Sequence, residues 1–297
     1  MQADSGTHTD DQKPHFGVIH GAGIHLEYGH RTLVMGILNV TPDSFSDAGR
    51  TVTMAAAISA AEAMVAAGAD VIDIGGESSR PGASAVGLDE ELRRVLPVIE
   101  VLAPRLSVPI SIDTTKAGVA RRAFEAGARI LNDISALRFD PEMTEIVARA
   151  GVPVVLMHMQ GTPRDMQAQP HYADVVGEIC AFFEERLRAA EQGGIPRERV
   201  ILDPGIGFGK RLADNLEILR SLGRFHVFGR PLLVGASRKA FIGEILDLPV
   251  DARLEGTAAA VAAAVLAGAA LVRVHDVQAL VRVVRVAEAI RSGRTNP

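Results

Sequence analysis

The sequence is poor in aromatic residues and in cysteine. Among its 297 residues tryptophan is absent and aromatic side chains make up 4%, whereas alanine, valine, isoleucine and leucine are abundant. This composition suits parallel strands that lie buried beneath helices. The single cysteine, Cys180, cannot form a disulfide within the chain. We therefore expect a cytoplasmic location and a packed position for Cys180 on a helix.

Runs of basic residues and long apolar segments are also missing. The net charge of −5 gives no reason to expect nucleic acid as a partner. The longest apolar stretch, 258–272, is interrupted by Gly268 and is shorter than the roughly 20 residues of a membrane span, so we expect no membrane partner. It is typical of a buried helix that runs into a strand. The polar start predicts a disordered tail over 1–15, without a signal peptide, and one domain over 16–297.

After a short hairpin predicted over 16–27, apolar runs alternate with helical patterns. The spacing predicts strands over 33–38, 70–74, 109–112, 129–131, 153–157, 200–202, 231–234 and 270–274. It predicts helices over 54–67, 89–102, 116–126, 141–150, 174–192, 213–222, 238–246, 254–266 and 277–290. Eight strand–helix units, with the helix doubled after the seventh strand, indicate an α/β fold, a (β/α)8 TIM barrel. An open doubly wound sheet is the alternative, but its glycine-rich fingerprint is missing at the first strand.

Each predicted strand is followed by polar residues. The carboxyl ends of barrel strands form the active face of such enzymes. The first of these polar residues, strand by strand, are Asn39, Glu77, Asp113, Asn132, His158, Asp203, Ser237 and Arg273. A structural barrel has no need of a polar group at every strand end, so the pattern predicts a lined active site.

One group of these residues suits a flat heterocycle. Asp113 and Asp203 offer carboxylates, Asn132 an amide and Lys239 an ammonium group. A carboxylate can accept two parallel N–H bonds from a ring edge, which fixes the ring in its plane. The residue types also allow structural roles. Asp203 could cap a turn, Asp113 could cap the next helix, and Lys239 could be a solvated residue on the first turn of its own helix.

A second group suits an anion. Arg273 and His275 alternate along the last strand and so point the same way, and Asn39 is their neighbour once the barrel closes. Arg80 lies in a glycine-containing loop that can approach them. These residues predict a diphosphate site with a magnesium ion, which prefers phosphate oxygens and few protein oxygens. The alternatives are an Asx turn at Asn39 and a hydrogen-bonded strand-end histidine at His275.

Seven motifs in order resemble the dihydropteroate synthase family. They are NVTPDSFSD at 39–47, DIGGESSRPG at 73–82, NDI at 132–134, MHMQG at 157–161, DPGIGFGK at 203–210, SRK at 237–239 and RVHD at 273–276. The resemblance spans about 16–289. It implies a homodimeric transferase of folate synthesis that joins 4-aminobenzoate to the diphosphate ester of 6-hydroxymethyl-7,8-dihydropterin, uses Mg²⁺ and is the target of sulfonamides.

The resemblance also implies roles for particular residues. It implies catalytic roles, as pterin or diphosphate contacts, for Asp113, Asp203, Lys239, Arg273 and His275. Asn39 resembles the magnesium ligand, and Asn132 resembles a further pterin contact. The other implied substrate contacts are Ser79, Phe45, Arg80, Pro81, Met159, Phe208, Gly235 and Val274. The chain departs from the family pattern at Ser79, where threonine is usual, and at Ala240, where serine is frequent.

Two other functions share parts of this pattern. A methyl-tetrahydrofolate-binding module of a cobalamin-dependent methyltransferase would use the pterin-binding residues, but it would have no use for Phe45, Pro81 or the pair of Arg273 and His275. A non-catalytic paralogue would keep only the fold, although this chain retains both polar groups. For the synthase we expect catalysis by positioning and electrostatics, without an obligatory nucleophile.

Overall fold

The predicted barrel is confirmed by the computed structural model, which describes residues 16–40, 54–80 and 82–293. The parallel strands found in these ranges are β3 (Leu33–Asn39), β4 (Val71–Gly75), β5 (Ile110–Asp113), β6 (Ile130–Asp133), β7 (Val154–Met157), β8 (Val200–Asp203), β9 (Leu233–Val234) and β10 (Leu271–Val274). They pair in the order β8-β7-β6-β5-β4-β3-β10-β9. A parallel bridge between Leu202 and Leu232 joins the two outer strands and closes the ring.

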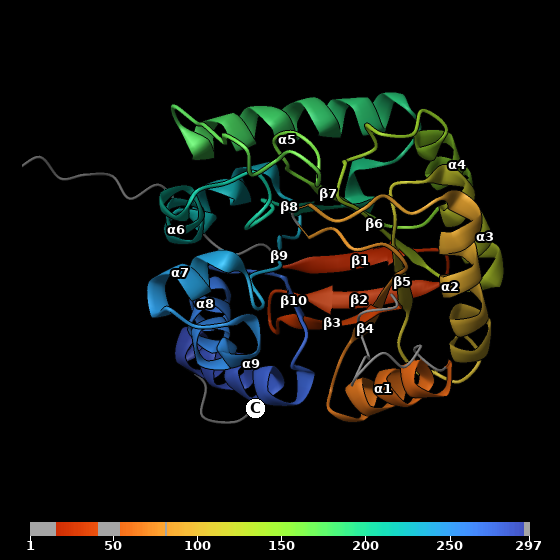
Figure 1. Cartoon of the computed structure of the whole chain (residues 1–297), viewed down its shortest axis with the longest axis horizontal. Coiled ribbons are helices and arrows are strands. Elements are labelled where there is room, and N and C mark those ends of the chain that lie inside the picture. The colour runs from red at the N-terminus through yellow and green to blue at the C-terminus, as the bar shows by residue number, and fades with distance from the viewer. Residues whose placement is uncertain (1–15, 41–53, 81, 294–297) are drawn as a thin grey trace, which may run out of the picture.

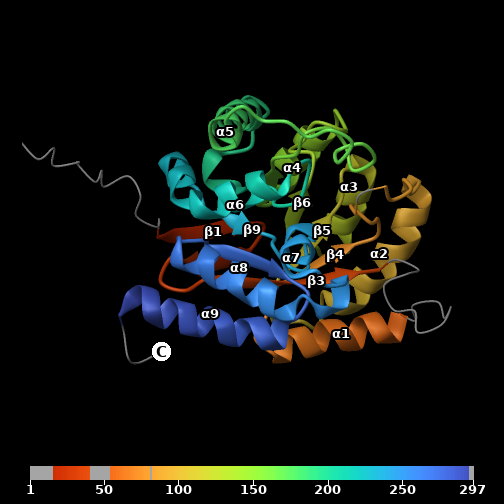
Figure 2. The same cartoon turned by 60° about the vertical axis from the view of Figure 1, so that its left-hand side comes forward.

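The helices form a ring around the strands (Figure 1, Figure 2). In the described ranges they are α1 (Met54–Ala66), α2 (Leu88–Leu102), α3 (Ala117–Ala126), α4 (Met143–Ala150), α5 (Val175–Gln192), α6 (Leu212–Arg220), α7 (Ala240–Leu246), α8 (Leu254–Leu266) and α9 (Val277–Ser292). The doubled helix predicted after the seventh strand is the pair α7 and α8. The apolar stretch 258–272 is the end of α8 followed by the start of β10, as predicted. Within the described residues, no helix combines the length and apolar character needed to cross a membrane.

The predicted hairpin is formed by the antiparallel strands β1 (Gly17–Gly21) and β2 (Ile24–Tyr28). Ile19 and Tyr28 are buried and belong to one apolar cluster with residues near the starts of the barrel strands. The hairpin therefore covers the N-terminal end of the barrel. The tail predicted over 1–15 lies outside the described residues.

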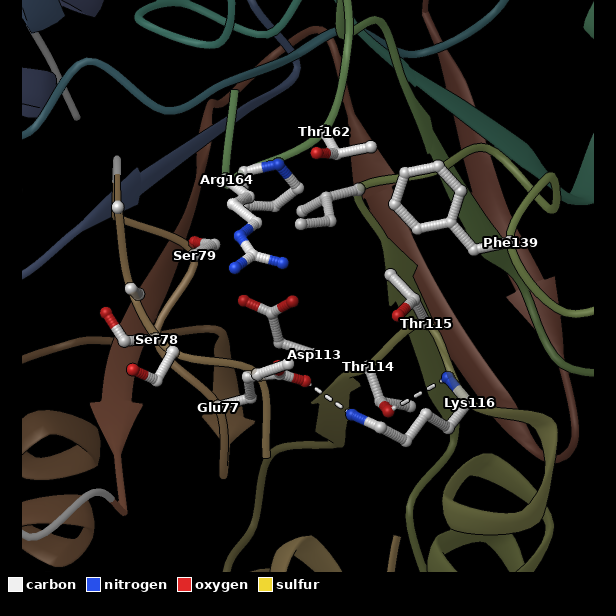
Figure 3. A pocket seen from close by; sticks show the side chains of 16 residues that line it. Glu77, Ser78, Ser79, Asp113, Thr114, Thr115, Lys116, Phe139, Thr162 and Arg164 are labelled. Atoms are coloured by element: carbon white, nitrogen blue, oxygen red, sulfur yellow. Dashed lines mark hydrogen bonds and ion pairs between the residues drawn. The ribbon is translucent and has the colours of Figure 1, made fainter. Parts of the chain in front are cut away.

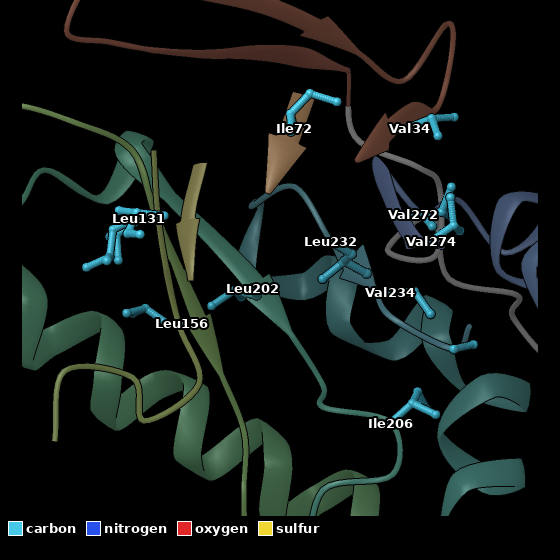
Figure 4. Close-up of a cluster of buried hydrophobic side chains, with 14 of the residues drawn as sticks. Val34, Ile72, Leu131, Leu156, Leu202, Ile206, Leu232, Val234, Val272 and Val274 are labelled. Atoms are coloured by element: carbon cyan, nitrogen blue, oxygen red, sulfur yellow. The ribbon is translucent and has the colours of Figure 1, made fainter. Parts of the chain in front are cut away.

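Alternate strand residues divide the core into two parts, as a period of two requires. One set faces outward and packs beneath the helices; it includes Val34, Ile72, Leu131 and Val272 (Figure 4). The other set faces the barrel interior and forms the cluster below the hairpin; it includes Leu33, Val71, Ile130, Ile201 and Leu271. This alternation fixes which later residues of each strand also face inward.

Candidate active site

A polar layer lies directly above the apolar interior of the barrel. Asp73, Asn132, Asp203 and Arg273 each follow an inward-facing apolar residue of their strand by two positions. Residues two apart on a strand share a face, so all four point into the barrel toward its carboxyl end. The structure thus brings together three predicted residues. It adds Asp73, which is not among the residues predicted from the sequence because it sits within an apolar run.

Arg273 is the centre of this layer. Its Nε donates to Asp73 Oδ2 at 2.6 Å, and its Nη2 donates to Asp113 Oδ2 at 2.6 Å. Asn132 Nδ2 donates to the same Asp73 oxygen at 3.0 Å, while Asp73 Oδ1 is buried without a hydrogen-bond partner. Arg273, which the sequence assigns to the anion-binding group, is therefore in direct contact with Asp113 of the group assigned to the pterin. Buried carboxylates need a cation, and Arg273 supplies it from β10, which only β3 separates from the strand of Asp73.

Burial sets the charge state of the carboxylates. It raises the pKa of Asp113 to about 7, which Arg273 opposes and the negative charge of Asp73 reinforces. Burial also raises the pKa of Asp203 to about 6, against the lowering effect of the Gly205 N–H bond and of Lys239. For Arg273 burial acts to lower the pKa, but its pairs with Asp73 and Asp113 outweigh burial and raise it. The site therefore holds carboxyl groups that can gain a proton near neutral pH.

The alternative structural roles are found in part. Asp203 does cap a turn, because its Oδ1 accepts the Gly205 N–H at 2.7 Å. Asp113 does not cap α3, since the first N–H of that helix donates to Asp140 Oδ2 at 2.8 Å. Lys239 is not simply solvated. Its Nζ lies 3.9 Å from the centre of the Phe208 ring, and burial lowers its pKa to about 8.

A second lysine, Lys210, is buried behind Asp203 and is not predicted from the sequence. Its Nζ donates to Phe208 O at 3.0 Å and to His158 O at 3.2 Å, and it lies 3.0 Å from His158 Nδ1. Three acceptors match the three protons of an ammonium group. Burial lowers the pKa of His158 to about 2, and Lys210 adds to this, so the imidazole is neutral and can accept at Nδ1. Only the folded arrangement reveals this pair, because 52 positions separate the two residues.

His275 is also held as a neutral ring. Burial and the nearby Arg273 lower its pKa to about 3. Ser237 Oγ accepts the His275 backbone N–H at 3.2 Å and lies 2.9 Å from His275 Nδ1. The serine proton is free to donate to Nδ1, so we assign the ring proton to Nε2. His275 can then donate one hydrogen bond to an anion without carrying a charge.

Asn39 is the last residue of β3. Gly75 of the neighbouring strand β4 lies between Asn39 and Asp113 and has no side chain to separate them. A methyl group on Gly75 would lie 3.8 Å from Asn39 Oδ1 and 3.8 Å from Asp113 Oδ2. In the described part of the chain, no three or more His, Cys, Asp or Glu side chains gather as a metal site. One or two neutral or acidic oxygens are the donor set of a magnesium ion that takes its other ligands from phosphate and water. These residues therefore fit Mg²⁺ together with a phosphorylated ligand.

A cavity of about 540 Å³ opens beside this layer and is large enough for a small organic ligand. Of the predicted site residues, Ser79 and Asp113 line it. Figure 3 shows the Arg164 guanidinium reaching toward Asp113 from one side, while Glu77 and Lys116 lie on the other. Asp113 is part of the cavity lining, and the Arg273 side chain lies between Asp113 and Asp73, hydrogen-bonded to both.

The remaining predicted residues take different positions. Met159 and Phe208 belong to a buried apolar cluster that also contains Ile134. Gly235 lies close to Arg273, since a methyl group there would be 3.9 Å from Arg273 Cβ. The Val274 side chain faces the outer core, so only its backbone faces the site. Arg80 is exposed. Phe45 and Pro81 lie outside the described residues.

The fold and the polar layer define a barrel enzyme that holds a flat, hydrogen-bonding ring at the carboxyl ends of its strands. The profile of the family described as pterin binding enzyme matches residues 35–275, and the chain belongs to that family. Within it, the chain is one of the dihydropteroate synthases. It is 49% identical to dihydropteroate synthase from Synechocystis sp. over 266 residues, which cover 89% of this chain and 92% of the relative.

Solved structures agree with this assignment. The Yersinia pestis dihydropteroate synthase in a sulfonamide complex has a TM-score of 0.89 and 46% identity, and the match covers 93% of this chain and 100% of that chain. The Xanthomonas albilineans enzyme in complex with 7,8-dihydropteroate has a TM-score of 0.83 and 44% identity, and the match covers 93% of this chain and 99% of that chain. All three relatives are dihydropteroate synthases, as the sequence motifs predict.

Proposed function

We propose that the polar layer binds the pterin ring of the diphosphate ester and that 4-aminobenzoate attacks its methylene carbon to give 7,8-dihydropteroate and diphosphate. The observation that carries this proposal is the inward-facing set of Asp73, Asp113, Asn132 and Asp203 around Arg273. Carboxylate and amide groups accept from the ring N–H groups, and the cations donate to ring acceptors. The product found in the Xanthomonas albilineans relative supports this ligand class.

The residues assist a bond cleavage that precedes attack. The methylene C–O bond breaks and the electron pair leaves with the diphosphate, so negative charge develops on the leaving oxygen. We assign the stabilisation of that charge to His275 Nε2–H, Ser79 and Arg273. The cationic methylene that remains is conjugated with the pterin and is stabilised by the Asp113 and Asp203 carboxylates. The arylamine then attacks as a neutral nucleophile, and the proton lost from its nitrogen passes to solvent.

Asn39 and, beside it, Asp113 would hold the magnesium ion. Bound there with the substrate, Mg²⁺ would neutralise charge on the diphosphate oxygens. The two protein oxygens face the same gap over Gly75, which leaves the other coordination positions to phosphate and water. We expect chelation of Mg²⁺ by EDTA to abolish turnover, and Asn39→Ala to raise the Mg²⁺ concentration needed for half-maximal turnover. Equal Mg²⁺ dependence of the variant and the wild type would remove Asn39 from the metal site.

The proposal also includes a homodimer. Large apolar side chains are exposed on the neighbouring elements α7, α8 and α9 and between them, namely Ile245, Leu246, Val250, Leu254, Val286 and Ile290. Exposed apolar surface of this kind is typical of a surface that another subunit covers. Sedimentation of Val286→Glu should give monomers where the wild type gives dimers. Val227→Glu, on a residue that is equally exposed but lies on the segment Leu222–Phe228, is the matched control and should stay dimeric.

The direct test of the activity is a condensation assay. Purified protein is mixed with the pterin diphosphate ester, 4-aminobenzoate and Mg²⁺, and released diphosphate and dihydropteroate are measured together. We expect equal amounts of both products. Diphosphate release without dihydropteroate would identify a hydrolase and contradict the proposal.

A further inference from the structure

The loop between β4 and α2 carries Ser79 and is held at its two ends by one side chain. Glu77 Oε1 accepts the backbone N–H of Val86 at 3.0 Å, and Glu77 Oε2 pairs with Lys116 Nζ. Glu77 thus joins the start of the loop to its end. The same carboxylate ties the loop to the segment that follows β5.

Lys116 has a second acidic partner that is fully buried. Its Nζ lies 2.6 Å from Oε2 of Glu91, which has no exposed surface and belongs to the first turn of α2. Glu91 Oε1 is buried without a hydrogen-bond partner. A buried ion pair is often no more stable than a pair of well-packed apolar side chains. Stability alone therefore gives no reason for a charged pair at this position.

The base of the loop is pressed against the same helix. A methyl group on Gly76 would lie 2.8 Å from Val95 Cγ1 and 3.0 Å from Glu91 Cγ, so any larger residue would push against α2. Arg94 Nη1 also donates to Gly76 O at 2.9 Å. These contacts fix the point from which the loop leaves the barrel.

The ion pairs of Lys116 with Glu77 and Glu91, here called the clamp, also lie close to the carboxylates of the polar layer, which form the floor of the site. Lys116 follows Asp113 by three residues, and both line the cavity together with Glu77 and Ser79 (Figure 3). Neither Lys116 nor Glu91 contacts the polar layer around Arg273 in any hydrogen bond described for them. The ion pairs therefore connect the segment that bears a pterin-binding carboxylate to the loop that bears Ser79.

We propose that Lys116, paired with Glu77 and Glu91, is a positioning residue that sets the place of Ser79 relative to Asp113. It acts on the diphosphate end of the substrate through the loop and does not touch the substrate. The inference rests on the proposed function in one respect, since it takes Ser79 as a diphosphate contact. It predicts that loss of the clamp affects ligands that carry a diphosphate and spares the free pterin.

The test compares two ligands on matched variants. Calorimetry measures the affinity of the pterin diphosphate ester, with Mg²⁺, and of the same pterin without diphosphate. For Lys116→Met we expect the affinity for the ester to fall about tenfold and that for the free pterin to change by less than about twofold. Lys116→Arg keeps the charge and should recover most of the lost affinity. An equal fall for both ligands, or none, would overturn the proposal.

A double variant separates positioning from stability. Lys116→Met alone leaves Glu91 charged and unpaired in the core, which can prevent folding. Lys116→Met with Glu91→Leu replaces the pair by apolar side chains and should restore the melting temperature, yet Glu77 still lacks its cation. We expect this stable variant to bind the ester weakly. Wild-type affinity for the ester would mean that the clamp serves stability only.

Hydrogen exchange gives a readout that does not depend on the reaction. Backbone amides over residues 78–80 and 82–86 should exchange faster in the double variant than in the wild type, while amides of α5 should be unchanged. If the wild type fails to make dihydropteroate, the proposed function fails, but the exchange comparison still decides whether the clamp holds the loop. Unchanged exchange over 78–80 and 82–86 would overturn the clamp.

Discussion

The two ends of the barrel are built from the same strands but for different purposes. At the N-terminal end the inward-facing residues, such as Leu33 and Ile130, are apolar and are covered by the hairpin through Ile19. Two positions further along, the inward-facing residues include Asp73, Asp203 and Arg273. Two residues of strand span about 7 Å, so the change from packing to chemistry occurs within that distance.

The N-terminal end of the barrel is built for stability, whereas the carboxyl end contains groups that lower stability but can bind a ligand. The covered end buries the apolar side chains of its cluster, which stabilises the fold. The open end buries carboxylates whose pKa values are raised and a carboxylate oxygen without a partner. Such groups cost free energy unless they are fully paired, and their incomplete pairing leaves hydrogen-bonding capacity for a ligand. Substitutions at the two ends should therefore be separable by assay.

Arg273→Ala should have the largest effect, because it removes the cation shared by Asp73 and Asp113. Breaking a buried pair costs about 3–5 kcal/mol of stability, and losing a donor to the leaving group lowers turnover by about 10²–10³. Thermal unfolding and turnover of the same preparation measure the two effects. Since Arg273 contacts the floor carboxylates, binding of free pterin should weaken as well.

The control for Arg273→Ala is Arg273→Lys, which keeps the positive charge but cannot reproduce the guanidinium hydrogen bonds to both Asp73 and Asp113. It should recover stability more than turnover. Normal turnover in Arg273→Ala would place the anion-binding group elsewhere in the barrel mouth.

Leu33→Ala tests the covered end. Truncating this buried side chain should lower the free energy of unfolding by roughly 2–5 kcal/mol. Turnover per folded molecule should not change, because Leu33 lies below the polar layer. Urea unfolding and kinetics at low temperature provide the pair of measurements. A loss of turnover equal to that of the Arg273 variant would mean that the two ends are not independent.

Asp203→Asn should have a smaller effect that is confined to the ligand. The amide presents a donor to a ring donor, and an unpaired buried group costs roughly 1–3 kcal/mol, so pterin affinity should fall about tenfold or more. Asp133→Asn is the matched control. Asp133 is equally buried, but its carboxylate accepts the N–H groups of Ser135 and Leu137 and faces away from the ring. Calorimetry should show normal pterin affinity for that variant, and unchanged affinity in Asp203→Asn would remove Asp203 from the floor.

The pH dependence of pterin binding is the mildest test. Binding requires ionised Asp203, whose pKa is raised to about 6 in the free protein. Affinity should therefore be full above this pKa and be lost as the pH falls through it, by about tenfold between pH 7 and pH 5. Asp113 has a pKa of about 7, so its protonation should begin to weaken pterin binding at a higher pH than that of Asp203. A flat affinity between pH 8 and pH 5 would show that these carboxylates do not bind the ring.

Local patterns were sufficient to predict the barrel. Short apolar runs, helix periodicity and polar strand ends depend on neighbouring residues, and the strand that holds Asn39 does pair with the strand that holds Arg273. Side-chain contacts between strands that are not paired could not be predicted in the same way. Alternation correctly placed Arg273 on an inward face, but it could not say that the side chain would reach past β3 to Asp73, 200 positions away.

Counting inward positions would have identified Asp73. It lies two residues after Val71, in the same layer as Asn132. No comparable signal exists for the pair of Lys210 and His158, or for the clamp at Lys116, because each depends on loops that meet only in the fold. The predicted roles of Phe45 and Pro81 stay predictions, since both lie outside the described residues.

The arrangement around Arg273 has an electrostatic consequence. Three carboxylates and three cationic side chains are gathered in and behind the described polar layer, namely Asp73, Asp113, Asp203, Lys210, Lys239 and Arg273. The floor is then close to neutral overall, which suits an uncharged ring. We expect the long-range attraction for a highly charged diphosphate to come from the exposed rim, where Arg80 and Arg164 lie, and Arg273 and His275 to act once the ester is bound. Salt screens exposed charges more than buried ones. Raising the ionic strength should therefore slow the association of the ester with the protein, while the affinity for its pterin ring should hardly change.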